Sequence, residues 1–306
     1  MELELDARLR AFAAYARRES FSRAADELAI SQPAVSRHVA DLEARLRLTL
    51  VDRQARRGGL TAGGRYLAEA VLRAEGLLSQ AERGVAAFRS DGVAKLAIVA
   101  SGTPGTYLVP ALVSEFHAAH PGIELEVLMA TSAAAVEMVR NHKAEVGIVG
   151  GFADSAEMEA SPLVDDEIVV VAAPGAADGR SRRDFLSVAT WVSREEGSAT
   201  RSALEAAWRD LGITPRSRLE LPSWEAVKLL VARGGAVAAC STLAIDVELR
   251  AGVLEVLDVP GWRIHRTISV VRARDAPLTP PARDFLDLLK GLANGGAATQ
   301  TPTPPA

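Results

Sequence analysis

The pattern of apolar and polar positions predicts three short helices at the start of the chain. Residues 5–16 place an apolar residue at every third or fourth position, as one face of a helix requires. Ser22 is expected to cap a second helix and Ser31 a third, because a serine hydroxyl accepts a hydrogen bond from the free N–H groups of a first turn. Pro33 is tolerated in the first turn of the third helix. The residues expected to face inward are Leu5, Leu9, Phe12 and Ala16, then Ala24, Ala25 and Leu28, then Val35, Val39, Leu42 and Leu46.

A basic turn and a long helix follow. Residues 50–60 have strand-like ends around an arginine-rich turn with glycines, which predicts a hairpin wing. Thr61 opens a helix that reaches about Phe88, and its apolar residues alternate by three and four as in a coiled-coil seam. A helix of roughly 40 Å is poorly stable unpaired in water, so we expect it to pair with a second copy; packing on its own domain is the alternative. The seam consists of Leu67, Ala70, Val71, Ala74, Leu77, Leu78, Ala81, Val85 and Phe88.

Beyond residue 92 the pattern changes to alternating strands and helices. Such alternation predicts an α/β fold whose parallel strands are joined by right-handed crossovers. Strands are expected at 95–100, 123–130, 146–149, 166–173, 189–192, 236–239 and 267–272. Helices are expected at 104–120, 133–141, 200–212, 224–233 and 281–292. The tail 294–306 holds Gly, Thr and Pro with no apolar residue larger than Ala, so it is expected to be disordered.

Composition excludes several classes of protein. No apolar run approaches the roughly 18 residues of a membrane span, and the acidic start of the chain does not resemble a secretory signal. Cys240 is the only cysteine of the 306 residues, which excludes a disulfide framework and a cysteine-bound metal cluster. It follows an apolar strand and is expected to be buried rather than a redox sensor. We therefore expect a cytoplasmic protein of two or three domains, with no membrane association and no cofactor.

Charge is distributed unevenly along the chain. The 35 basic and 39 acidic residues give a net charge of −4. Residues 1–66 hold twelve arginines against nine acidic residues, so the remainder of the chain carries the acidic excess. Guanidinium groups suit phosphate oxygens and guanine edges. A basic segment on an acidic body indicates contact with nucleic acid, and a merely solvated face is the alternative.

The second and third predicted helices form a candidate DNA-reading unit. Two short helices joined at a tight turn have helix-turn-helix geometry, in which the second helix enters the major groove. Gln32 can pair with adenine and Arg37 with guanine or phosphate, while wing arginines contact flanking phosphates. The candidate DNA-binding residues are Ser31, Gln32, Pro33, Ser36 and Arg37 on the helix and Arg53, Arg56 and Arg57 on the wing.

The run from Phe21 to Ser36, then Leu42-Glu43 and Leu60 to Gly64, closely resembles the LysR-type transcriptional regulators. These motifs span some forty residues in order. Val51 departs from the family's usual aromatic residue before the wing, which puts the packing of the wing in question.

The resemblance implies a specific architecture and set of partners. It implies a winged helix-turn-helix domain at 1–60, a dimerisation helix at 61–90 and an effector domain at 91–293 that resembles a type II periplasmic binding protein. Lobe I of that domain would comprise 93–162 and 268–292, and lobe II 163–267, with a small molecule bound between them. It also implies a homodimer that assembles into a tetramer, a duplex operator with an inverted repeat, and RNA polymerase as a further candidate partner.

Polar residues follow three predicted strands and open the helices behind them. In open α/β sheets ligands bind at the carboxyl ends of strands, beside helix N-termini. The segment 192–201 resembles the cleft segment of relatives that sense oxyanions, sulfur compounds or phosphorylated sugars, which points to an anionic effector. Helix capping is the alternative role for each hydroxyl, and Trp224 either narrows the cleft or packs in the core. The candidate effector-binding residues are Ser101, Thr103, Thr131, Gly150, Arg194, Ser198 and Thr200.

The sequence gives little support for an enzyme. His117 and His120 have the spacing of a solvated helix face, and His142 and His265 have no nearby partners for a metal site or a triad. Gly102-x-x-Gly105 is too short for a dinucleotide fingerprint. A free ligand-binding module and a catalytic domain on a DNA-binding head remain as rivals, but the first leaves residues 1–90 unexplained and the second lacks a paired nucleophile and base.

Overall fold

A computed structural model describes residues 3–52, 59–88, 93–152, 154–177, 179 and 181–294. The chain divides into two compact units, one of Met1–Ala86 with Asn141–Lys143 and one of Ala87–Arg140 with Ala144–Ala306. Each unit is described by itself. Among the described residues, no helix combines the length and the apolar character needed to cross a membrane.

The first unit is a bundle of three short helices beside one long helix. Phe12 and Tyr15 are almost fully buried and lie at its centre, together with Val35 and Val39. Val51 is also buried in this core at 2% exposure, so the base of the wing packs at this position without the aromatic residue. The helices are α1 (Ala7–Arg18), α2 (Phe21–Leu28), α3 (Gln32–Leu46) and α4 (Ala62–Ala86).

Two local predictions for this unit are wrong. Ser20 rather than Ser22 caps α2, because Ser20 is extended and its side chain accepts a hydrogen bond from Arg23 N at 3.4 Å. Leu46 is 48% exposed, since α3 ends there and Arg47 turns the chain with a φ of 51°. The long helix also ends at Ala86, two residues before the predicted Phe88.

The base of the wing is a short antiparallel pairing. Val51 bridges Leu60, and Thr61 N donates to Leu50 O at 2.9 Å. Thr61 then caps α4, because its Oγ1 accepts a hydrogen bond from Gly64 N at 2.9 Å. The arginines predicted to contact phosphate, Arg53, Arg56 and Arg57, lie outside the described residues.

The second unit is built on one sheet with the strand order β2-β1-β3-β9-β4-β7-β5-β6, and β8 pairs with β4. The predicted parallel pairing holds for β1 with β2 and β3 and for β5 with β6 and β7, but β4 and β9 pair antiparallel to their neighbours, so the sheet is mixed. The strands are β1 (Ala94–Ser101), β2 (Ile123–Ala130), β3 (Val146–Gly150), β4 (Met158–Ala172), β5 (Thr190–Ser193), β6 (Ser217–Glu220), β7 (Ala236–Ser241), β8 (Glu255–Leu257) and β9 (Ile264–Ala273).

The helices of this unit differ from the prediction in two ways. The helix expected at 104–120 is broken at Leu108, since Pro110 follows in the first turn of the second piece and cannot donate a hydrogen bond. Two short helices, α8 and α11, were not predicted. The helices are α5 (Gly102–Tyr107), α6 (Val109–Ala119), α7 (Ser132–Arg140), α8 (Arg182–Val188), α9 (Ala199–Leu211), α10 (Trp224–Ala232), α11 (Asp246–Arg250) and α12 (Pro280–Asn294), with a 3-10 turn η1 (Thr242–Ala244).

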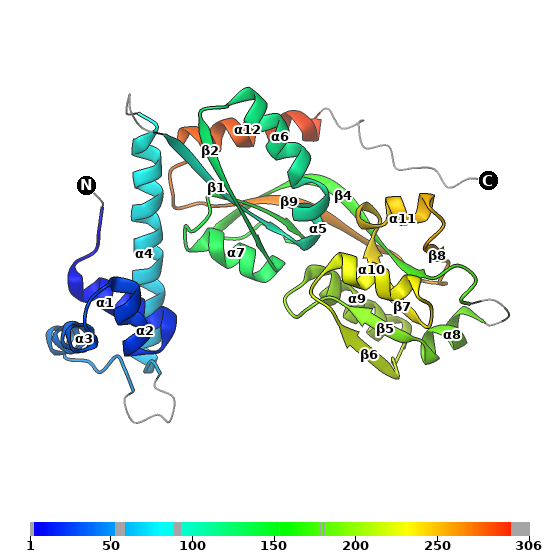
Figure 1. Cartoon of the computed structure of the whole chain (residues 1–306), viewed down its shortest axis with the longest axis horizontal. Coiled ribbons are helices and arrows are strands. Elements are labelled where there is room, and N and C mark those ends of the chain that lie inside the picture. Colours follow the sequence, from blue (N-terminus) through cyan, green and yellow to red (C-terminus); the bar gives the residue numbers. More distant parts are fainter. Residues whose placement is uncertain are drawn as a thin grey trace. The chain divides into compact units, whose positions relative to one another are not determined.

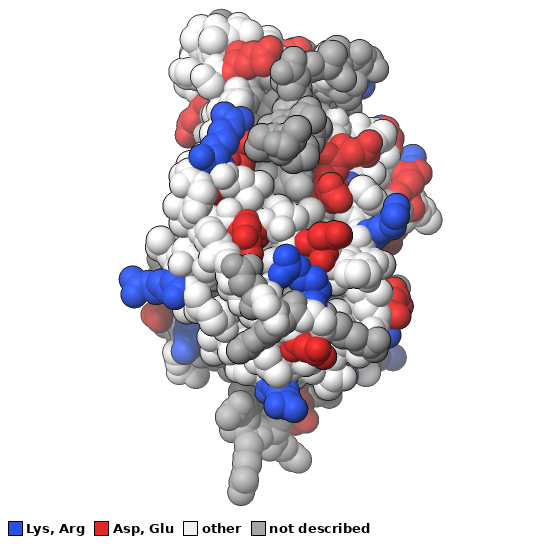
Figure 2. Space-filling view, turned by 90° about the vertical axis from the view of Figure 1, so that its right-hand side faces the viewer, with Lys and Arg blue, Asp and Glu red and all other residues white. Residues whose placement is uncertain are grey.

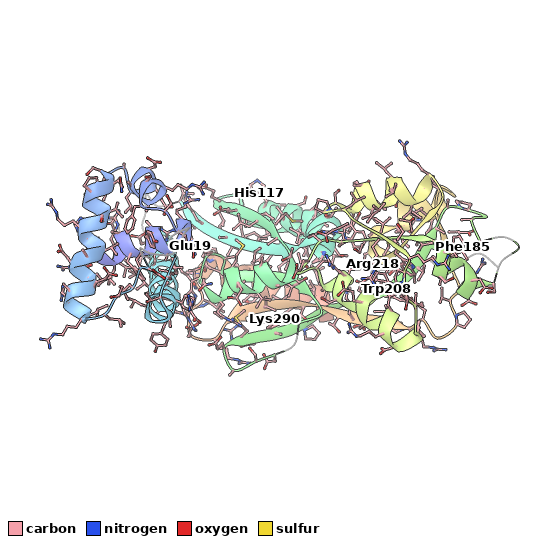
Figure 3. The ribbon with its side chains drawn as sticks, turned by 90° about the horizontal axis from the view of Figure 1, so that it is seen from below. Glu19, His117, Phe185, Trp208, Arg218 and Lys290 are labelled. Carbon is pink, nitrogen blue, oxygen red and sulfur yellow. The ribbon has the colours of Figure 1, made fainter. Side chains whose placement is uncertain are left out.

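Two lobes with separate cores share the sheet. Lobe I surrounds β1, β2 and β3, and Phe116 and Phe285 meet edge to face in its core. Lobe II surrounds β5, β6 and β7, and its core holds Trp191 against Trp208. Arg218 lies over the Trp208 ring at 4.6 Å, and Figure 3 labels both residues. Strands β4 and β9 run side by side from one lobe to the other (Figure 1).

Charged residues are mixed by sign on the face shown in Figure 2. Lysine and arginine side chains stand among aspartate and glutamate side chains rather than gathering in one area. A patch of one sign, which a nucleic-acid surface requires, is therefore not visible among the described residues of this face.

Candidate functional site

The N-terminal end of α3 presents a polar surface to solvent. Ser31 caps the helix by accepting a hydrogen bond from Ala34 N at 3.4 Å. Gln32, Pro33 and Arg37 are exposed and Ser36 is half-buried, whereas the opposite face of the helix packs into the core. An exposed polar helix end on a buried apolar support is the geometry that reads a major groove.

Glu43 fixes the wing to the same helix. Its Oε1 accepts hydrogen bonds from the backbone N–H groups of Leu50 at 2.7 Å and of Val51 at 3.1 Å. The buried stripe of α3 and this carboxylate therefore hold α3 and the base of the wing together. Sequence reasoning noted Glu43 as part of a motif but did not predict this contact.

A small polar cavity lies between the two lobes of the second unit. Its empty space is about 230 Å³, counted with space open to solvent, which is smaller than the roughly 300–1,000 Å³ of typical ligand pockets. Six of the seven predicted effector residues line it, and the exception is Gly150. The lining residues are Ser101, Gly102, Thr103, Thr131 and Ser132 from lobe I, Arg194, Glu195, Ser198, Ala199 and Thr200 from lobe II, and Arg266 from β9.

The hydroxyl groups of the cavity differ in their present partners. Thr131 Oγ1 accepts a hydrogen bond from Ala134 N at 3.2 Å, so this residue is a helix cap. Ser101 and Ser198 stand at the N-caps of α5 and α9, but neither side chain caps its helix. Ser101 Oγ instead accepts from Gly150 N at 3.3 Å. Capping therefore does not account for the two serines.

Arg194 is held in place on three sides. Its Nε and one terminal nitrogen donate to the two carboxylate oxygens of Glu195, each at 2.8 Å. Its guanidinium lies over the ring of Trp224 at 5.0 Å, so Trp224 both packs in lobe II and supports the cavity wall. A Cβ on Gly102 would come within 2.7 Å of Arg194, so only glycine leaves room for the guanidinium there. Arg194 is thus a rigid cation at the wall of the cavity.

Arg266 is the functional candidate that sequence reasoning missed. Its Nε donates to Asp166 Oδ2 at 2.7 Å, and its two terminal nitrogens donate to Thr200 Oγ1 at 3.0 Å and Thr103 Oγ1 at 3.2 Å. A Cβ on Gly150 would lie 3.1 Å from the guanidinium, so Gly150 contributes space for Arg266 rather than a contact. The pairing of β4 with β9 brings these residues together, and no local signal in the sequence predicted that pairing.

The remaining chemical candidates do not form a site. Cys240 is fully buried, and burial raises the pKa of its thiol to about 12, so it stays protonated at neutral pH and is a core residue, not a redox sensor. Among the described residues, no group of three or more His, Cys, Asp or Glu side chains is arranged to hold a metal ion.

Comparison with known proteins identifies the family. Residues 7–65 match the family described as "Bacterial regulatory helix-turn-helix protein, lysR family", and residues 90–294 match the "LysR substrate binding domain". The uncharacterized HTH-type transcriptional regulator YeiE of Escherichia coli (strain K12) is 33% identical over 283 residues, which cover 91% of this chain and 94% of YeiE.

Two solved structures share the fold. CbnR, in a complex with its target DNA, aligns with a TM-score of 0.64 at 22% identity and covers 94% of this chain and 99% of its own. The regulatory domain of CcmR from Synechocystis PCC6803, in complex with 2-PG, aligns with a TM-score of 0.60 at 26% identity and covers 66% of this chain and 98% of its own. These families are transcriptional regulators rather than enzymes, and this chain belongs to the LysR-type transcriptional regulators.

Proposed function

We propose that α3 reads an operator in the major groove and that a small anion bound between the lobes modulates this activity. The function proposed for each segment follows the sequence prediction: DNA binding at 1–60, dimerisation at 61–90 and effector binding at 91–293. The proposal rests on the presence of two features in one chain. One is an exposed polar helix end, and the other is a separate cavity lined by hydroxyl and guanidinium groups. Such a regulator would work in the cytoplasm, where bacterial DNA lies.

The DNA-reading residues have distinct proposed roles. Gln32 would pair with adenine, and Arg37 with a guanine edge, because both are exposed at the start of α3. The wing arginines would contact flanking phosphates, which fix register without reading sequence. The likeness to CbnR in its DNA complex is compatible with this docking.

Replacing Arg37 tests the reading of bases. Arg37→Ala is expected to weaken operator binding by about 1–3 kcal/mol and to relax the base preference at one position, because a bidentate base contact is lost. Arg56→Ala serves as the comparison, since loss of a phosphate contact weakens all sequences alike and flattens the salt dependence. Fluorescence anisotropy on the chain's own upstream DNA and on random DNA measures both. Equal losses on the two DNAs for both variants would contradict these roles.

Self-association is part of the proposal. Val85 is 58% and Phe88 80% exposed near the end of α4, and large exposed apolar side chains on a long helix favour pairing with a second copy. A two-fold pair of recognition helices predicts an inverted-repeat operator. Tetramer formation through the effector domains and contact with RNA polymerase remain expectations from the family.

The cavity favours a small anion as the effector. Two guanidinium groups, of Arg194 and Arg266, line it against the single carboxylate of Glu195, so its lining is net positive. Five of its polar residues are at most 8% exposed, namely Ser101, Thr103, Arg194, Ser198 and Thr200. The N-terminus of α9 also faces the cavity, and no side chain caps it. Its free backbone N–H groups are therefore further donors for an anion. CcmR, which shares the fold, holds 2-PG in its solved structure.

Thermal-shift measurements test the anion class. Sulfate and phosphate, each compared with chloride at the same ionic strength, are expected to raise the melting temperature of the full chain. Arg194→Gln is expected to weaken the apparent affinity for these anions at least about tenfold, because a charged hydrogen-bond donor is lost. The shift in melting temperature should become smaller accordingly. Shifts that chloride reproduces, or that Arg194→Gln leaves unchanged, would exclude an anion at this cavity.

A further inference from the structure

Asp166 and Arg266 form a nearly buried ion pair across the two strands that join the lobes. Asp166 of β4 and Arg266 of β9 are direct partners in the antiparallel ladder. Their side chains are 0% and 8% exposed, and a terminal nitrogen of Arg266 lies 2.7 Å from Asp166 Oδ2. Arg266 lines the cavity while Asp166 does not. The pair therefore turns its positive end toward the cavity and keeps its negative end in the interior.

The hydrogen bonds of Arg266 fix the direction of two hydroxyl groups. Thr103 belongs to α5 of lobe I and Thr200 to α9 of lobe II, and both hydroxyl oxygens accept from Arg266, at 3.2 and 3.0 Å. A guanidinium can only donate, so each threonine uses one of the two acceptor positions of its oxygen on Arg266 and keeps its own proton for another acceptor. Within the described part of the chain, neither hydroxyl donates to a protein atom.

Asp166, the buried partner of the pair, also accepts a hydrogen bond from another residue. Ser241 Oγ donates to Asp166 Oδ1 at 2.6 Å and accepts from Leu243 N at 3.2 Å. Both carboxylate oxygens of Asp166 are therefore occupied by donors, which keeps Arg266 in its orientation. The cavity's own carboxylate, Glu195, already accepts two hydrogen bonds from Arg194.

We propose that the Asp166–Arg266 pair turns the hydroxyl groups of the effector site so that they donate hydrogen bonds to the ligand. The site then selects a fully ionised oxyanion over one that carries a proton. This inference rests on the proposed anion site. Arg266 is a positioning residue that turns Thr103 and Thr200, one from each lobe, into donors aimed at the same ligand. A group with a proton of its own, such as hydrogen phosphate, meets two hydroxyls that already accept from Arg266 and a carboxylate, Glu195, that already accepts from Arg194, so an acceptor for its proton is in short supply. A buried donor without an acceptor is strongly disfavoured.

Sulfate and phosphate are matched probes for this proposal, since they have similar size and shape but only phosphate keeps a proton near neutral pH. Isothermal titration of the full chain at constant ionic strength is expected to show sulfate binding at least tenfold more tightly than phosphate. Thr200→Val removes one donor and one acceptor of Arg266 but leaves the contact of Arg266 with Asp166 in place, and it is expected to weaken sulfate binding at least tenfold. The pair itself is tested by the double variant Asp166→Asn with Arg266→Gln. It replaces both charged groups by amides, so no buried charge is left unpaired. The hydroxyls of Thr103 and Thr200 are then free to turn.

The double variant is expected to bind phosphate about as well as sulfate. Its control is Glu159→Gln with Arg272→Gln, which removes an ion pair between directly opposed residues of the same two strands, away from the cavity. The control is expected to keep the affinity and the tenfold preference.

Three results would overturn the proposal, each in a different way. A double variant that keeps both the affinity and the sulfate preference would show the pair to be structural only. Equal binding of sulfate and phosphate by the unmodified chain would refute the donor polarity and leave the anion site standing. Failure of both anions to bind would remove the proposed effector class and this inference with it.

Discussion

A Gly64→Ala substitution is expected to weaken operator binding by destabilising the first unit. A Cβ on Gly64 would lie 2.0 Å from the carbonyl oxygen of Leu50, which is backbone and cannot rotate away. The Leu50 backbone is held on both sides, by Glu43 at its N–H and by Thr61 N at its carbonyl. Overpacking of a core costs about 1–3 kcal/mol, and we expect the upper end here because the neighbour is fixed.

Gly63→Ala is the matched control for this prediction. The nearest atom to a Cβ on Gly63 is a terminal carbon of Leu48 at 2.7 Å, and Leu48 is 49% exposed and free to swing outward. The gain in helix propensity offsets that movement, so the stability is expected to change by less than about 1 kcal/mol. Calorimetry and gel shifts on both variants measure the difference. Equal destabilisation by the two alanines would contradict the clash with Leu50, and anion binding should persist in both.

Local elements of this chain could be predicted well because their signals lie within a few residues. Apolar spacing and capping residues gave the four helices of the first unit, with Ser31 and Thr61 as caps. The misplaced cap of α2 has a simple cause. Ser20 and Ser22 stand two positions apart, and sequence alone does not tell which backbone is extended.

Pairings between distant segments could not be predicted in the same way. Strand β4 begins at Met158, eight residues before its predicted start, because its first half contains Pro162 and a register shift that hide the strand pattern. Strand β4 pairs with β9 about a hundred residues later, and that pairing creates the contact of Asp166 with Arg266. Residues at helix starts that line the cavity could therefore be predicted from sequence, whereas the arginine between the lobes could not.

The largest effect expected in the second unit comes from Lys228. This residue of α10 is 6% exposed, and its ammonium binds Glu225 at 2.8 Å and Glu248 at 2.7 Å. It also lies 5.4 Å from the ring centre of Tyr107, which belongs to α5 of lobe I. Lys228→Met would leave Glu248, only 18% exposed, without its cation. Breaking a buried pair in this way costs about 3–5 kcal/mol.

The pH dependence separates this ion pair from simple packing. Burial alone would lower the pKa of Lys228, but the hydrogen bonds that its ammonium donates to Glu225 and Glu248 outweigh burial and raise the pKa above the ordinary 10.5. A raised pKa means that the charged form stabilises the folded state fully below about pH 10.5 and less as the pH rises through the folded value. The difference in unfolding free energy between the parent and Lys228→Met should therefore stay constant from about pH 6 to pH 9 and become smaller above about pH 10.5, whereas a loss of packing alone would not depend on pH there.

Two further variants make the measurement decisive. Lys228→Met with Glu248→Gln is expected to recover most of the lost stability, because no unpaired charge remains. Lys290→Met, which breaks another pair at spacing i,i+3 but on a side chain 71% exposed, is expected to change stability by less than about 1 kcal/mol. Urea unfolding of all three at pH 7 gives the free energies. If the double variant were as unstable as Lys228→Met alone, the loss would come from the packing of the lysine stem beneath Tyr107 and not from the charge left on Glu248.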